Sequence, residues 1–122
     1  MAQKNRKHTE KAVVLNKYNQ GQMHYLYIIN SGVEIVKFGT TTRPDKRLKA
    51  HRLKWPNAWM LYKIPFDSGE EARGVERMLV RRFRHCAVPG HTEQITGIAD
   101  AEVWRAFKFE WARWRFENPK VY

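Results

Sequence analysis

The sequence has little cysteine and no long apolar run. Its single cysteine, Cys86, excludes an internal disulfide bond, and a reducing compartment fits that composition. The longest apolar stretches, such as Tyr25 to Ile29, are too short for a transmembrane helix. The first residues are polar and basic and lack the apolar segment of a secretory signal. We therefore expect a soluble intracellular protein.

Acidic residues are also scarce. The 122 residues include 12 Asp and Glu against 23 Lys and Arg, which gives a formal net charge of +11. Such an excess favours a polyanionic partner, because neutralising phosphates releases counterions. DNA or RNA is the obvious polyanion, and an anionic membrane surface is the alternative. Hydrophobic residues make up 43% of the chain, so it is expected to fold as one domain with a modest core.

Composition divides the chain into three parts. Residues 1–23 form a basic arm, which could follow a phosphate backbone or be a solvated tail. Residues 24–99 carry the strand and helix signals of the main domain. Residues 100–122 are expected to form an amphipathic helix with Asp100 as its cap. Four large aromatic residues repeat on one face of this helix: Trp104, Phe107, Trp111 and Trp114. That face is expected to pack against the domain or against a second copy.

The main domain has signals for three strands and two helices. Three ranges rich in β-branched and aromatic residues predict strands: 25–29, 34–38 and 58–64. Two ranges with helix-start signals predict helices: 44–53 and 69–84. Residues 85–99 contain proline, glycine and polar residues and are expected to be mainly loop. This order predicts an α+β fold with a small, mainly antiparallel three-stranded sheet flanked by helices.

The first two predicted strands form a hairpin that would bring Tyr27 to Lys37. A loop of residues 31–33 places these two side chains opposite each other on one face of the sheet. An ammonium beside a phenol favours the phenolate, so the pKa of Tyr27 is expected to fall. The alternative is a half-buried core tyrosine beside a lysine that reaches solvent. Gly39, at the strand end, permits close approach of a phosphate or a tight turn.

The order of these elements resembles the GIY-YIG nuclease superfamily, in particular its small phage and bacterial branch with lysine in place of the second motif tyrosine. The resemblance covers roughly residues 24–96. The two family motifs match Tyr25-Leu26-Tyr27 and Lys37-Phe38-Gly39, and the helical arginine and the later acidic residue fall at Arg47 and Glu76. The resemblance implies a GIY-YIG-like catalytic domain over residues 24–99 and a metal-dependent endonuclease that hydrolyses phosphodiester bonds of DNA.

The resemblance also implies roles for four residues, Tyr27, Lys37, Arg47 and Glu76, whereas the role of His51 is inferred from its helix spacing alone. Tyr27 would take a proton from the attacking water, and Lys37 would lower the pKa of Tyr27 or contact the phosphate. Arg47 would stabilise the transition state, and His51, four residues later, shares its helix face and is expected to contact phosphate or relay a proton. Glu76 would bind a single Mg²⁺ or Mn²⁺. The alternatives are an exposed helix charge for Arg47 and an ordinary helix ion pair for Glu76.

Four further basic residues are expected to contact nucleic acid: Arg43, Lys46, Lys49 and Arg52. DNA is favoured over RNA as the partner, no membrane partner is expected, and a homodimer remains open. The resemblance places the protein in the cytoplasm of a bacterial cell, with a phage gene as an option. Two alternatives to an endonuclease remain. One is a catalytically inactive nucleic-acid-binding protein on the same scaffold, and the other is a phage-type inhibitor or host-takeover protein.

Overall fold

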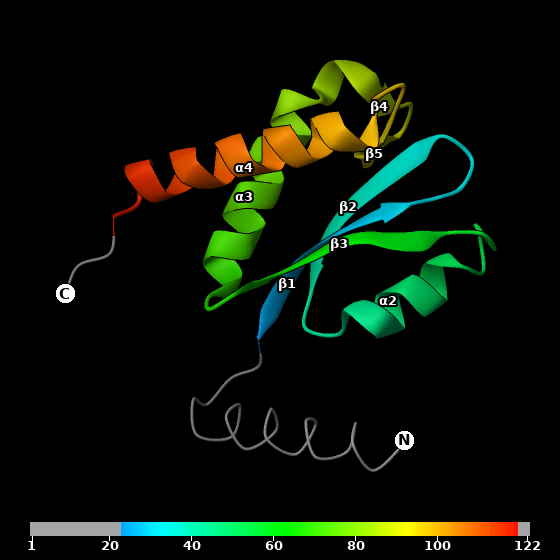
Figure 1. The fold of residues 1–122 in the computed structure, drawn as a ribbon, viewed down its shortest axis with the longest axis horizontal. Helices are drawn as coiled ribbons and strands as arrows, with labels where there is room; N and C mark the ends of the chain where they lie inside the picture. Colours follow the sequence, from blue (N-terminus) through cyan, green and yellow to red (C-terminus); the bar gives the residue numbers. More distant parts are fainter. Residues whose placement is uncertain (1–22, 120–122) are drawn as a thin grey trace, which may run out of the picture.

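Five antiparallel strands form one sheet, and helices cover both of its faces (Figure 1). The computed structural model describes residues 23–119, so nearly all of the predicted basic arm lies outside the described residues. The strands are β1 (His24–Asn30), β2 (Ile35–Thr41), β3 (Trp59–Phe66), β4 (Ala87–Val88) and β5 (His91–Thr96). The helices are α2 (Pro44–His51), α3 (Gly69–Arg82), the short 3-10 helix η1 (Arg84–Cys86) and α4 (Asp100–Glu117). The α+β class is therefore confirmed.

The sheet has the strand order β3-β1-β2-β5-β4, so it contains five strands where the sequence predicts three. The two additional strands lie in the region predicted to be loop. They were missed because β4 has only two residues and β5 buries only Gln94 and Ile95, which leaves little apolar alternation. Gly90, with a φ of 81°, turns the chain between them. β5 then pairs with β2 and extends the sheet beyond the first hairpin.

The register of the first hairpin differs from the predicted one. Ser31 is buried, and its Oγ accepts hydrogen bonds from the backbone N–H groups of Val33 and Ile35, at 3.0 and 3.1 Å. The Ser31 N–H donates to the carbonyl of Ile35 at 2.8 Å, so Ser31 pairs with Ile35 and the loop consists of residues 32–34. This loop lies one residue later than predicted. Lys37 consequently pairs with Ile29 rather than with a tyrosine.

The larger core lies between the sheet and α3 with α4. The sequence pattern Ser68-Gly69-Glu70-Glu71 predicts a cap at the start of α3, and Ser68 Oγ accepts a hydrogen bond from the N–H of Glu71 at 3.1 Å. The Glu71 carboxylate accepts a hydrogen bond from Trp111 Nε1 at 2.8 Å. From there the apolar face of the helix packs Val75 and Leu79 against buried side chains of β1 and β2. In this way α3 is fixed on one face of the sheet, with its polar side at the edge of that core.

Helix α4 crosses α3 (Figure 1). Its aromatic residues pack against the core of the domain. Trp104 stacks on Tyr62 of β3 with ring centroids 4.5 Å apart. Gly74 of α3 lies against the ring of Trp114, where a Cβ on the glycine would come within 2.1 Å of the indole. Asp100 is the first residue of α4 rather than its cap, because its carboxylate accepts a hydrogen bond from Asn30 Nδ2 at 3.1 Å.

The opposite face of the sheet carries a smaller core beneath α2. Tyr27, Ile29, Trp55 and Ala58 are buried there, with Leu48 of α2 packed against them. The helix begins at a proline, as predicted, and ends at residue 51, two residues earlier than predicted. None of the helices in residues 23–119 combines the length and apolar character that a membrane span needs. The two cores place α2 and α3 on opposite faces of the same central strands.

An ion pair between α3 and α4 offers a test of this packing. Glu110 is 3% exposed and contacts Arg82 at 2.9 Å and Arg113 at 3.2 Å. We expect Arg82→Ala to lower the free energy of unfolding by about 1–2 kcal/mol, since it leaves a buried carboxylate with one cation and Arg82 itself is partly exposed. Urea unfolding measures the change. Arg81→Ala, at the exposed neighbouring position, is the control, and equal stabilities of the two variants would contradict the prediction.

Candidate active site

Polar side chains from five elements meet at one place in the fold. The cluster consists of Tyr27 from β1, Lys37 from β2, Arg47 and His51 from α2, Glu76 from α3 and Glu93 from β5. The structure therefore brings together the five residues proposed from the sequence and adds Glu93. The sequence does not reveal that carboxylate, because it predicts loop where β5 lies. The two-residue spacing between Glu93 and the buried Ile95, which puts both on one face of a strand, is the signal in the sequence that could have placed Glu93 there.

Tyr27 and His51 form a hydrogen-bonded pair across the sheet and α2. The Tyr27 hydroxyl lies 3.1 Å from His51 Nε2. The tyrosine is only 1% exposed and lies directly over Gly39, where a Cβ would come within 2.2 Å of its ring and hydroxyl. In the observed register Tyr27 pairs with Gly39. The glycine is therefore required for the position of the tyrosine ring.

The expected fall in the pKa of Tyr27 is wrong. Burial raises the pKa of Tyr27 above 10, and the nearby charge of Arg47 opposes this only in part. Lys37 does not lie opposite the tyrosine, and its ammonium lies 3.5 Å from Glu93 instead. The hydroxyl of Tyr27 thus remains protonated at neutral pH, and it serves as a hydrogen-bonding partner for His51.

His51 is the accessible member of this pair. Its ring is partly exposed and stacks on Trp55 with centroids 5.9 Å apart. Burial lowers the pKa of His51 below 6.5, and the positive charges of Lys37 and Arg47 lower it further. The imidazole is therefore neutral at physiological pH and able to accept a proton.

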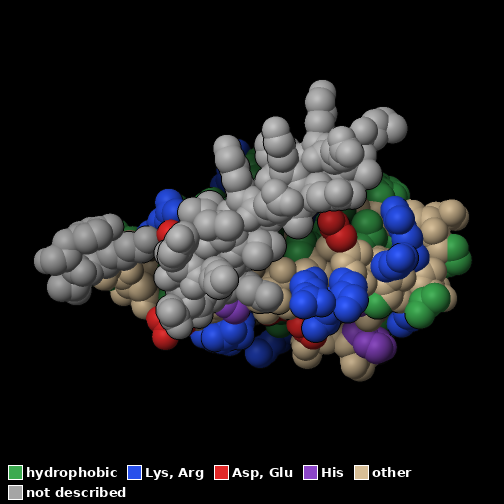
Figure 2. Space-filling view, turned by 90° about the horizontal axis from the view of Figure 1, so that it is seen from below, with side chains coloured by type: hydrophobic (Ala, Val, Ile, Leu, Met, Phe, Trp, Pro, Cys, Tyr) green, Lys and Arg blue, Asp and Glu red, His purple; other side chains and the backbone are tan. Residues whose placement is uncertain are grey.

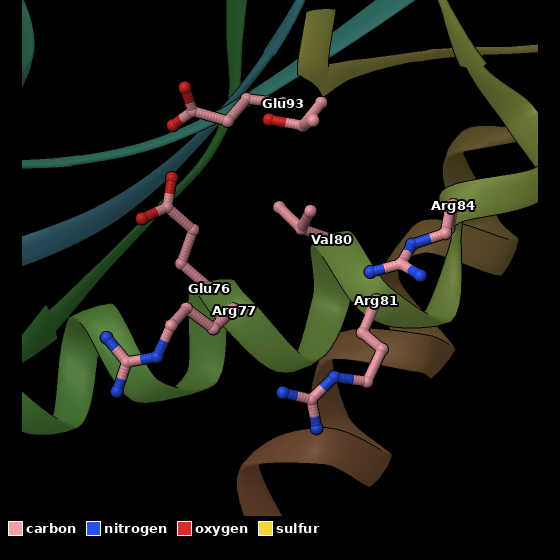
Figure 3. Close-up of a pocket in the computed structure, with 7 residues that line it drawn as sticks. Glu76, Arg77, Val80, Arg81, Arg84 and Glu93 are labelled. Carbon is pink, nitrogen blue, oxygen red and sulfur yellow. The ribbon is translucent and has the colours of Figure 1, made fainter.

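Two carboxylates face each other beside the pair. Figure 3 shows the side chains of Glu76 and Glu93 directed toward the same space. Burial and the neighbouring Glu93 carboxyl raise the pKa of Glu76 to about 7, whereas the hydrogen bond with Glu76 lowers the pKa of Glu93. The two groups therefore share negative charge unequally, with the ionised carboxylate of Glu93 held beside the ammonium of Lys37.

The carboxylate pair has the donor chemistry for a divalent cation. Glu76 Oε2 is buried without a hydrogen-bond partner, and both carboxylates line an open pocket of about 310 Å³. Residues 23–119 contain no group of three or more His, Cys, Asp and Glu side chains placed to hold a metal. Mg²⁺ nevertheless suits such a site, because it binds through one or two carboxylates and keeps several waters. Glu76 and Glu93 would be the protein ligands.

Helix α2 presents basic residues beside the cluster. Arg47 is exposed, and its charge acts on both Tyr27 and Glu93. With Arg43 and Lys46 it lines a pocket of about 380 Å³. Figure 2 shows the groups of Lys and Arg side chains on the face of the molecule seen from below.

The two remaining basic residues proposed to contact nucleic acid lie in different settings. Lys49 is exposed on α2. Arg52, just after the helix, donates from Nε to the carbonyl of Ala58 at 2.8 Å, so it also holds the loop that leads to β3. Together with Arg43 and Lys46, these residues are four exposed cations along or beside one short helix.

The raised pKa of Glu76 predicts a pH-dependent change in stability. An ordinary carboxyl titrates near 4.5 and folded Glu76 near 7, so ionising it in the folded state lowers stability as pH rises between these values. We expect Glu76→Gln to be more stable than the wild type at about pH 8, and this advantage to vanish at about pH 4. Thermal unfolding at both pH values measures it. The control is Glu102→Gln on α4, and an advantage independent of pH would contradict the assignment.

Comparison with known proteins corrects the family inferred from the motifs. The T5orf172 domain model matches residues 24–112, and no GIY-YIG family matches, so the assignment to the GIY-YIG superfamily is wrong. The few ordered residues that suggested it are too sparse to define a family across the whole domain. No curated protein and no solved structure matches the chain. T5orf172 domains are associated with nuclease-like and DNA-binding functions. Since the match covers most of its length, the chain belongs to the T5orf172 domain family.

Proposed function

We propose that this protein is a divalent-metal-dependent endonuclease that hydrolyses phosphodiester bonds of DNA. The observation that carries the proposal is the convergence of three kinds of group in one site. These are the Tyr27–His51 pair, the exposed guanidinium of Arg47 and the facing carboxylates of Glu76 and Glu93. Phosphodiester hydrolysis needs a proton acceptor, stabilisation of charge at phosphorus and help for the leaving oxygen. The net charge of +11 favours a polyanionic substrate.

His51 accepts the proton of the attacking water in this proposal. Tyr27 is almost wholly covered and keeps its proton, whereas His51 is partly exposed and neutral. When His51 Nε2 donates its hydrogen bond to the tyrosine hydroxyl, Nδ1 is free to take a proton. Tyr27 then fixes the tautomer and orientation of the imidazole. General-base catalysis of this kind contributes about 10²–10⁴-fold to a rate.

Arg47 binds the scissile phosphate. Its guanidinium can donate two parallel hydrogen bonds to phosphate oxygens and stabilise the charge that develops on them. It is exposed at the edge of the α2 pocket, and its charge already acts on Glu93 and Tyr27. Lys37 holds Glu93 through their ion pair and is a positioning residue.

Glu76 and Glu93 bind the cation. A divalent cation bound there supplies Lewis acidity for the phosphate and stabilises the leaving oxygen. A carboxyl must be deprotonated to be a charged ligand, so a bound cation would favour the ionised form of Glu76. The orphaned Oε2 of Glu76 supports this role, since a buried carboxylate oxygen without a partner otherwise costs stability.

Cleavage of supercoiled plasmid with Mg²⁺, Mn²⁺ or EDTA tests the proposal. We expect metal-dependent nicking by the wild type and a loss of at least about 10²-fold in Glu76→Gln and His51→Gln. Tyr27→Phe keeps more activity than His51→Gln, because the tyrosine hydroxyl only orients His51, which is the proton acceptor. Glu102→Gln on α4 is the matched control. Equal loss in Tyr27→Phe and His51→Gln would move the proton-accepting role to the tyrosine.

A catalytically inactive nucleic-acid-binding protein is the second candidate. The near-complete burial of Tyr27 favours it, since a covered hydroxyl cannot meet water directly. Salt-sensitive DNA binding by the wild type, without cleavage in any metal, would replace the endonuclease by this candidate.

The close contact between Gly39 and Tyr27 gives a further prediction. We expect Gly39→Ala to displace the tyrosine ring, lower the melting temperature and reduce cleavage. In Gly39→Ala/Tyr27→Leu the shorter side chain makes room for the new methyl group, so stability recovers relative to Gly39→Ala. Cleavage stays low, since the hydroxyl that orients His51 is missing. Thermal unfolding and plasmid nicking separate the two effects. Additive losses of stability in the double variant would contradict the steric explanation.

A further inference from the structure

A row of arginines lies beside the carboxylate pair, away from α2. Arg77 and Arg81 of α3 and Arg84 of η1 line the same pocket as Glu76 and Glu93 (Figure 3). A spacing of four residues places Arg77 and Arg81 on one face of α3, and Arg84 follows just after the helix, in η1. All three are exposed.

The carboxylate pair lies between two basic surfaces. Glu76 interacts with the charge of Arg77 from α3, whereas Glu93 interacts with the charge of Arg47 from α2. The α3 pocket contains both carboxylates, and the α2 pocket, lined by Arg43, Lys46 and Arg47, belongs to the helix on the opposite face of the sheet. A strand of nucleic acid whose scissile phosphate lies at the carboxylates would meet cations in both directions.

The arginines of the α3 pocket differ from their neighbours in their partners. Arg82 is held by Glu110, and Arg115 by Glu71. By contrast, Arg81 and Arg84 have no ion pair or side-chain hydrogen bond to any residue in the described part of the chain. Favourable interaction with the C-terminus of α3 accounts for basic residues in its last turn. It does not account for two unpaired guanidinium groups lining one pocket with the acidic pair.

We propose that Arg81 and Arg84 bind the phosphate backbone of DNA on the side of the scissile phosphate opposite to α2. This rests on the proposed function. Each guanidinium offers a planar fork of donors that matches phosphate oxygens. The exposed hydroxyl of Thr92 lies in the same pocket and adds a donor, while Val80 supplies an apolar wall for a sugar. The strand crosses the site from the α2 pocket to the α3 pocket.

Binding of a short fluorescent DNA duplex in EDTA, where no cleavage occurs, tests the proposal. The variant Arg81→Ala/Arg84→Ala loses about 10-fold or more in affinity, and its slope of log K against log salt falls by about 1.8, because two phosphate contacts are gone. Arg105→Ala/Lys108→Ala removes the same charge from exposed positions of α4 and is the control. Arg81→Lys/Arg84→Lys keeps the charge and recovers most of the slope. Equal slopes in the alanine variant and the α4 control would overturn the proposal.

The outcome is separable from that of the proposed function. If the wild type does not cleave but Arg81→Ala/Arg84→Ala loses affinity and has a smaller salt slope, phosphate binding by Arg81 and Arg84 is supported and the endonuclease proposal is contradicted. If the wild type cleaves and the variant binds and cleaves like the α4 control, the endonuclease stands and the arginine surface falls. In a cleaving protein, shortening the DNA on one side of the cut reduces wild-type cleavage and leaves the variant unchanged. Equal effects on both proteins would overturn the assignment of a side.

Discussion

The register of β1 on β2 decides which side chains meet at the candidate site. It is set by the hydroxyl of Ser31, a small polar group that is buried and accepts two backbone hydrogen bonds across the loop. Those bonds close the loop at residues 32–34, and in the register that follows Tyr27 pairs with Gly39. The tyrosine then has room to lie across the strand and reach His51, while Lys37 is left to bind Glu93. A single side chain outside the site thus sets the partners of two residues within it.

The site concentrates acidic groups in a protein with few of them. Glu76 and Glu93 face each other, with Lys37 paired to Glu93, and Glu76 is buried enough for its pKa to rise to about 7. Burying neighbouring carboxylates lowers stability unless something binds them. Local conflicts of this kind are typical of functional sites, where stability is given up for chemistry. The carboxylate pair and the strictly placed Tyr27 therefore point to the same region of the fold.

Much of the scaffold could be predicted from the sequence, because its signals are local. Three signals depend on neighbouring residues alone: the residue types of the first hairpin's strands, the proline that starts α2 and the cap at Ser68. The register depends on a buried serine whose burial no local pattern reveals. β4 and β5 are short, and pairing within the sheet, of β5 with β2 and of β4 with β5, stabilises them more than their own composition does. Because the sequence does not predict β5, it does not place Glu93 at the site. The expected fall in the pKa of Tyr27 depends on a pairing of Tyr27 with Lys37 that the structure does not have.

The net charge does not show which cations are available to a partner, because the fold pairs some of them with carboxylates. Arg82 pairs with Glu110 and Arg115 pairs with Glu71, and both ion pairs join α3 to α4. Arg113 pairs with Glu110 within α4. Carboxylates of the same domain already balance the charge of these arginines, so the arginines contribute little to the binding of a partner. The cations of α2 and the unpaired Arg81 and Arg84 remain beside the acidic pair. Unpaired cations close to the carboxylates would offset the repulsion between these acidic groups and a phosphate chain.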